Sequence, residues 1–159
     1  MCWVPAGVSL DVPCEALAPV TEDNFEQLPY GLGEAECDWF EKHMKTASAE
    51  EKEAKVAEYR LRAEAGNAYG QALLGDCYFY GYGVAKDVKR MVELCTLSAE
   101  QGNAWGQHNL GVCFDRGRGV AVDKERAVDL YILAAEQSHI GAQHSLGEAF
   151  NVLSSIKPY

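Results

Sequence analysis

Apolar residues recur three and four positions apart through most of the chain after residue 34, which is the spacing of one face of an α-helix. The pattern also repeats as a block, because residues 67–102 and 103–138 agree at 19 of 36 positions without a gap. A period of about 20–50 residues is typical of stacked supersecondary units. Each copy has two amphipathic stretches joined by a glycine-containing turn, so the sequence predicts an all-α fold of helix pairs.

The first helix of each copy follows an asparagine, Asn67 or Asn103, whose side chain suits an N-cap. Its predicted buried stripe contains Leu74, Leu110 and Leu146, and also Tyr78, Phe114 and Phe150. A glycine lies in the middle of this helix in all three copies, at positions 75, 111 and 147. Glycine costs about 1 kcal/mol relative to alanine there. We therefore expect the missing side chain to allow close approach of the facing helix.

The turn between the two helices contains two glycines and an aspartate at fixed spacing. Gly81 and Gly117 suit the left-handed residue that ends a helix. Asp87 and Asp123 suit the N-cap of the second helix. That second helix is predicted to bury Val92, Leu94 and Leu97, matched by Val128, Leu130 and Leu133. The positions predicted to be fixed by the fold are Leu74, Gly75, Gly81, Gly83, Asp87, Leu110, Gly111, Gly117, Gly119 and Asp123.

The residues before and after the two copies fall into four segments. Residues 1–33 are predicted to be an acidic leader, irregular or partly disordered. Residues 34–66 read as a divergent helix pair, whose second helix starts with a capping-box pair at Ser48 and Glu51. Repeat 1 is 67–102, repeat 2 is 103–138, and residues 139–153 are the first helix of an incomplete repeat 3, followed by a tail at 154–159. Such an end either belongs to a longer array or is covered by the leader or by another molecule.

The repeated residues resemble a known family. Ala68-x-x-Gln71, Leu74-Gly75, Tyr78, Gly81-x-Gly83-Val84 and Asp87 resemble the Sel-one-like repeat (SLR), a sub-class of the tetratricopeptide-like helical repeats. The resemblance covers about residues 56–152. It implies a right-handed α-solenoid of antiparallel helix pairs, a role as adaptor or scaffold, and no shared catalytic residues. Secreted relatives join successive repeats through cysteine pairs, but the corresponding positions here hold Ala63 and Gln71, Ala99 and Gln107, and Ala135 and Gln143.

Charge and cysteine content limit the possible partners and the cellular compartment. The net charge is −10, which disfavours nucleic acid as a partner. No stretch approaches the roughly 18 apolar residues of a membrane-spanning helix, and the first 41 residues hold nine carboxylates and no Lys or Arg, unlike a targeting signal. These features predict a cytoplasmic protein without membrane insertion. Cys77, Cys95 and Cys113 are predicted to be buried free thiols, because equivalent positions of stacked helices lie about 8–10 Å apart.

The positions that change between copies suggest a binding surface. In the first helix they are spaced four, three and four residues apart, so they share one face. Tyr, Trp and Arg on such a face are typical of binding hot spots. An alternative is that Tyr69 and Trp105 belong to the core between repeats. Replacing Trp105 and Arg116 is predicted to weaken binding without lowering the melting temperature. The predicted partner-binding residues are Tyr69, Leu73, Asp76, Tyr80, Trp105, Asn109, Val112 and Arg116, with Gly141, Ser145, Glu148 and Val152 in the third copy.

Catalytic and metal sites are disfavoured by the pattern. His108 and His144, with Asp115 and Asn151, lack the spacing of a four-ligand metal site. A cysteine-dependent hydrolase would need Cys113 with His108 or His144, yet Cys113 lies on an apolar stripe. Gly81-x-Gly83 lacks the rest of a phosphate-binding loop. We therefore predict no enzyme activity, no metal and no cofactor.

The sequence favours a non-catalytic scaffold or adaptor that binds a peptide or protein on the first-helix face of the solenoid. The alternative is an accessory or regulatory fragment of a larger signalling or protein-degradation component, which would make an end-to-end contact through the last helix. A cysteine-dependent hydrolase is the remaining alternative.

Overall fold

Six α-helices follow one another in the computed structural model, which describes Phe40 and residues 43–155, with side chains as far as Asn151. The helices are α2 (Ala49–Glu64), α3 (Ala68–Tyr80), α4 (Val88–Glu100), α5 (Ala104–Arg116), α6 (Lys124–Glu136) and α7 (Ile140–Ser155). The described part contains no strand. The predicted leader and most of the predicted helix at 34–45 lie outside the described residues. Helix α7 continues two residues beyond the predicted end at 153.

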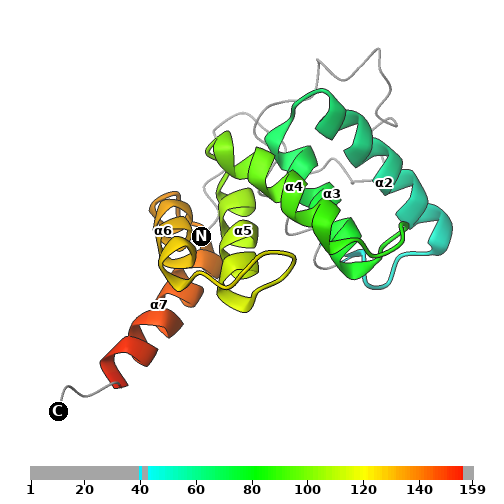
Figure 1. Cartoon of the computed structure of the whole chain (residues 1–159). Helices are drawn as coiled ribbons and strands as arrows, with labels where there is room; N and C mark the ends of the chain where they lie inside the picture. The colour runs from blue at the N-terminus through cyan, green and yellow to red at the C-terminus, as the bar shows by residue number, and fades with distance from the viewer. Residues whose placement is uncertain (1–39, 41–42, 156–159) are drawn as a thin grey trace, which may run out of the picture.

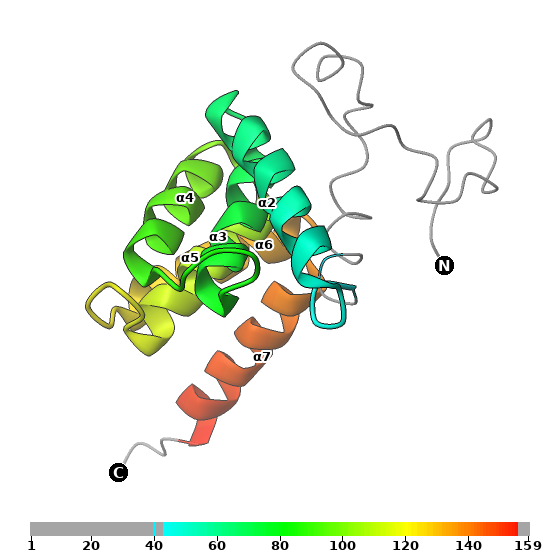
Figure 2. The ribbon, with the colours of Figure 1, turned by 90° about the vertical axis from the view of Figure 1, so that its right-hand side faces the viewer.

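Helices adjacent in sequence pack on each other, and α3 also contacts α5. Figures 1 and 2 show α3 between α2 and α4, and the chain winds on from there through α5 and α6. Helices α3, α5 and α7 are therefore the first helices of successive pairs, and α2, α4 and α6 are the second helices. This is the all-α solenoid that the repeat predicts.

Capping side chains begin the helices where the sequence predicts. Asn67 and Asn103 accept hydrogen bonds from the backbone N–H groups of Gly70 and Gly106, and Ser48 forms a complete capping box with Glu51. Asp87 and Asp123 cap α4 and α6 through the backbone N–H groups three residues further on. Each bond satisfies a donor that the helix itself leaves unpaired.

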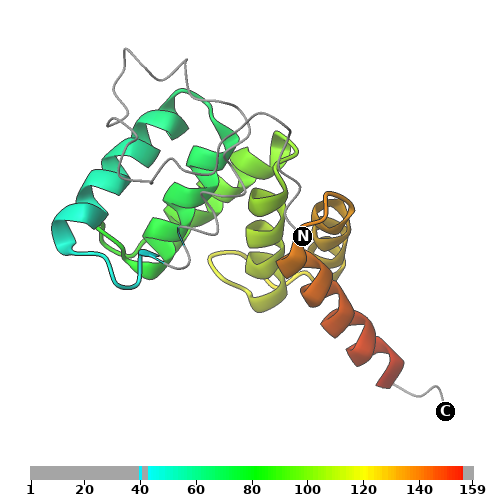
Figure 3. The same cartoon turned by 180° about the vertical axis from the view of Figure 1, so that it is seen from behind.

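Glycines permit the tight approaches between helices. A Cβ at Gly111 would lie 2.7 Å from the Tyr131 ring on α6, and one at Gly75 would lie 3.1 Å from the Cys95 sulfur on α4. A Cβ at Gly147 would meet nothing within 4 Å. The expectation of close approach is thus confirmed in repeats 1 and 2, whereas no described residue packs there in repeat 3. Figures 1 and 3 show the end of α7 extending beyond the other helices.

The core consists of two clusters along the array. The first contains Phe40, Met44, Val56, Tyr59, Leu73, Leu74 and Cys77, and the second contains Met91, Cys95, Leu110 and Cys113. Cys77, Cys95 and Cys113 are buried free thiols, as predicted. Each cluster joins helices of neighbouring pairs, so the packing of one repeat depends on the next.

The predicted buried stripe of the second helices is wrong at its last position, whereas Val92, Leu94, Val128 and Leu130 are partly buried. Leu97 and Leu133 are 48% and 47% exposed. The buried residues of α4 are Met91, Cys95 and Ser98, which are spaced four and three residues apart and therefore share a helical face. Phe150 is also exposed, at 56%, because no described helix covers this face of α7.

Candidate partner-binding groove

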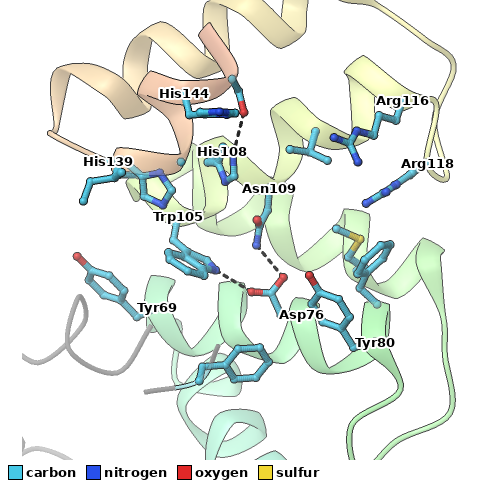
Figure 4. Close-up of a pocket in the computed structure, with 18 of the residues that line it drawn as sticks. Tyr69, Asp76, Tyr80, Trp105, His108, Asn109, Arg116, Arg118, His139 and His144 are labelled. Atoms are coloured by element: carbon cyan, nitrogen blue, oxygen red, sulfur yellow. Dashed lines mark hydrogen bonds between the residues drawn. The ribbon is translucent and has the colours of Figure 1, made fainter. Parts of the chain in front are cut away.

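A groove of about 890 Å³ runs along the side of the solenoid formed by α3, α5 and α7. Aromatic, cationic and histidine side chains line it together (Figure 4). Seven of the eight predicted partner-binding residues of repeats 1 and 2 belong to its lining, as do Gly141, Ser145 and Glu148 of α7. The changing positions of the first helices thus share one concave surface.

Leu73 is the exception, and its prediction as a surface residue is wrong. Its side chain is 0% exposed and belongs to the core cluster that contains Phe40 and Met44. The residues before α2 complete that cluster, so this position of α3 faces inward. Leu73 therefore offers no surface to a partner.

Asp76 joins two repeats beneath the groove. Its carboxylate accepts a 2.7 Å hydrogen bond from the indole N–H of Trp105 and a 2.9 Å bond from the side-chain amide of Asn109 (Figure 4). Asp76 is 6% exposed, so these bonds compensate for taking a charge out of water. They fix the position of Trp105 on α5 relative to α3.

Trp105 lines the groove and also packs between repeats, so it belongs both to the candidate binding surface and to the core between repeats. Its ring lies 5.2 Å from that of His139, at the start of α7. Replacing Trp105 would therefore break contacts with both neighbouring repeats. This opposes the expectation that the substitution leaves stability unchanged.

Two histidines link α5 to α7. The rings of His108 and His139 are 4.8 Å apart, and His108 Nε2 lies 3.4 Å from the Ser145 hydroxyl. Burial, together with the neighbouring His139 and Arg116, lowers the pKa of His108 to about 4. His108 is therefore neutral at pH 7. No group of three or more His, Cys, Asp or Glu side chains suited to a metal ion occurs within residues 40 and 43–151.

His139 takes the place that asparagine holds in the other repeats. Its Nδ1 accepts a 3.1 Å hydrogen bond from the backbone N–H of Ala142, as Asn67 and Asn103 do from the glycines three residues further on. His139 was not among the residues predicted to form the binding surface. The sequence could have indicated this residue, because its position holds asparagine in the first two copies and histidine in the third.

Arg116 and Arg118 lie at the end of the groove where α5 meets its turn (Figure 4). The Arg118 guanidinium carbon is 4.6 Å from the centre of the Phe79 ring, a cation–π geometry. Tyr80, which is 48% exposed, stacks on Tyr82 with ring centres 5.2 Å apart. This end of the groove therefore presents flat aromatic surfaces beside two positive charges. Phe79, Tyr82, Arg118 and Lys45 also line the groove, although the sequence analysis did not select them.

The Cys113 thiol is not placed for nucleophilic chemistry. Burial raises its pKa to about 11, and its sulfur lies 3.8 Å from that of Met91. A thiol with such a pKa is protonated at neutral pH and is therefore a weak nucleophile.

Comparison with known proteins identifies the repeated unit. The Sel1 repeat model matches residues 68–103 and 106–139. The chain contains two Sel1 repeats. Proteins built from Sel1 repeats are typically protein-binding scaffolds without catalytic activity.

Solved Sel1 structures show the same architecture. One is a protective antigen of uropathogenic Escherichia coli strains that displays an SLR fold, with 32% identity and a TM-score of 0.60 over 63% of this chain and 21% of that one. Another is a Sel1 repeat protein from Oxalobacter formigenes, with 32% identity and a TM-score of 0.58 over 63% of this chain and 40% of that one. The chain thus matches less than half the length of either protein. Among curated proteins, none matches it.

No helix within the described residues is long and apolar enough to cross a bilayer.

Proposed function

We propose that this Sel1 protein is a non-catalytic scaffold or adaptor that holds a segment of a partner protein in the groove along α3, α5 and α7. One observation carries the proposal: the side chains that vary between the repeats converge on one concave surface that is rich in Tyr, Trp and Arg. These residue types dominate binding hot spots because they combine large contact areas with directional polar groups.

The surface is suited to an extended segment. Aromatic rings line the groove at Tyr69 and Tyr80, and Arg116 adds a guanidinium group to the lining. Helix packing and the bonds to Asp76 hold the groove wall in place before a partner arrives. Such preorganisation reduces the entropy lost on binding.

A library of displayed peptides, selected on the immobilised protein, tests this function. Selected peptides are expected to bind the parent chain and to lose at least tenfold in affinity for Tyr80→Ala/Arg116→Ala, which corresponds to about 1.4 kcal/mol. Both side chains are exposed, so the variant should keep its melting temperature. Leu97→Ala/Leu133→Ala removes exposed side chains outside the groove lining and is the matched control. Equal affinity for both variants would refute the proposal.

A second candidate is that the chain is an accessory part of a larger component, joined end to end through α7. The observation in its favour is that no described residue lies within 4 Å of a Cβ at Gly147, where Gly75 and Gly111 meet the following helix. Ile140 is also 81% exposed. The test is hydrogen exchange: in a longer protein that covers α7, its amides should exchange more slowly than in this chain. Unchanged exchange would exclude such a cover.

A further inference from the structure

We infer that the groove is the docking site of the chain's own acidic N-terminal segment, residues 1–39, which competes there with a partner. The competition rests on the proposed function, whereas the docking itself does not. Three features support this occupant: the charge of the groove, the place where the segment is attached, and the aromatic residues of the groove and of the segment.

The groove has cations that its own carboxylates do not neutralise. Lys45, Arg116 and Arg118 line it, and none of them forms an ion pair with another residue of the described part. Of the two carboxylates in the lining, Asp76 is engaged by Trp105 and Asn109. The other, Glu148, lies 3.9 Å from His144 on its own helix. The lining thus holds three cations and two carboxylates, which makes it a region that attracts negative charge.

The N-terminal segment has the complementary charge. Residues 1–39 hold eight carboxylates and no Lys or Arg. Arginine binds carboxylates through two parallel hydrogen bonds, which gives such pairs both strength and fixed geometry. A segment of this composition is therefore attracted to the cations of the groove.

The residue that follows this segment in the chain lines the groove. Phe40 is 2% exposed and belongs to the groove lining. Its ring lies 6.2 Å from that of Tyr59 and 6.0 Å from that of Tyr82, so packing anchors it. Residues tethered at a binding site reach effective concentrations in the millimolar range. Three first helices at about 8–10 Å spacing span roughly 30 Å, which about ten extended residues cover. The segment is therefore long enough for this site.

Aromatic residues supply the rest of the match. The segment contains Trp3, Phe25, Tyr30 and Trp39. The groove presents Tyr69, Tyr80 and Phe79. Pairs of aromatic rings attract each other beyond the effect of the area they bury. A partner must displace these contacts. Its apparent association constant is therefore the intrinsic constant multiplied by the fraction of chains whose groove is unoccupied.

Paramagnetic NMR on the full-length chain tests the docking without any partner. Cys2→Ser/Cys37→Ser leaves Cys14 as the cysteine of the segment that carries a nitroxide label. Burial raises the pKa of Cys77 to about 12 and that of Cys113 to about 11, and Cys95 is also buried, so these thiols stay unlabelled in the folded protein. The readout is the indole N–H signal of Trp105, assigned with Trp105→Phe.

Docking predicts that the Trp105 signal loses most of its intensity while the nitroxide is oxidised and regains it on reduction. The loss should disappear in Arg116→Glu/Arg118→Glu and persist in Lys86→Glu/Lys89→Glu, which makes the same change in charge outside the groove lining. Salt at 1 M, where the Debye length is about 3 Å, should also restore the signal in the unmutated groove.

Equal intensity in the oxidised and reduced samples would overturn the inference, as would equal loss in the two double variants. A mixture of isotope-labelled chain without nitroxide and unlabelled chain with nitroxide should show no loss. A loss there would assign the contact to a second copy and likewise overturn docking within one chain. Peptide binding in the selection experiment, with no broadening here, would leave the proposed function standing and reject the N-terminal segment as occupant.

Discussion

The bond between Asp76 and Trp105 allows a quantitative test of how the repeats are coupled. Asp76→Ala removes the acceptor of two side-chain hydrogen bonds, of 2.7 and 2.9 Å, and leaves the Trp105 and Asn109 donors without it. A hydrogen bond to a charged group is worth about 1.5–3 kcal/mol. Both donors are half-buried, so water replaces part of that energy in the variant. We expect the free energy of unfolding to fall by about 2–4 kcal/mol.

A double-mutant cycle isolates the contribution of the indole N–H. Trp105→Phe removes this donor and some ring volume, and the cycle with Asp76→Ala cancels the volume effect. Urea unfolding followed by circular dichroism at the helix band gives the four free energies. The coupling energy should be about 1–2 kcal/mol. Additivity within about 0.5 kcal/mol would show that the contact does not join the repeats energetically.

Three further predictions concern single positions. The pKa of His108 is about 4 in the folded chain and 6.5 in the unfolded chain. Its favourable contribution to the free energy of unfolding is therefore fully present above pH 6.5, and it is lost as the pH falls from 6.5 toward 4. His108→Gln should therefore reduce the loss of stability between pH 7 and pH 4.5 by about 2–3 kcal/mol in urea unfolding; an unchanged pH dependence would contradict this. Ser138 has a φ of 66°, like Gly102 at 79°, so Ser138→Gly should raise the free energy of unfolding by about 0.5–1 kcal/mol and Gly102→Ala should lower it by about 1 kcal/mol. A lower melting temperature for Ser138→Gly would refute the strain. Gly111→Ala should destabilise by about 1–3 kcal/mol because its Cβ would meet a ring at 2.7 Å, whereas Gly147→Ala should stabilise by up to about 1 kcal/mol; a stabilising Gly111→Ala would contradict the close packing.

The local signals of the sequence were sufficient for the helices and their turns. Asn67 and Asp87 cap helices, and Gly81 and Gly117 end them in the left-handed conformation. Each of these features depends on a few neighbouring atoms. Short-range chemistry therefore predicts them without knowledge of the packing.

The errors arose where identity between the repeats was taken as evidence of burial. Leu97 and Leu133 are conserved between the copies but exposed, whereas the buried positions beside them change from Cys95 to Tyr131 and from Ser98 to Ala134. A buried site tolerates such changes when the facing residues change with it. Comparing two copies therefore favours the wrong face when the core is repacked from one repeat to the next.

The groove itself was predicted only in part. The four–three–four spacing located its face, but burial of Leu73 depends on Phe40 and Met44, which are about 30 residues away in sequence. The engagement of Asp76 by Trp105 likewise depends on how two helices are offset. Such relations arise from the superhelical arrangement, which no single repeat encodes.

The flank of α7 that no described helix covers has a mechanical consequence for the groove. This helix packs mainly on α6, whereas α3 and α5 each have a helix on both sides and contact each other. An element held on one side opens at a lower free energy than one held on both. This helix contributes Gly141, Ser145 and Glu148 to the groove lining. Two walls of the groove, α3 and α5, are therefore held rigidly, and the third wall, α7, is more flexible. Thermal fraying of α7 would vary the width of the groove at that edge, while the aromatic and arginine end keeps its shape.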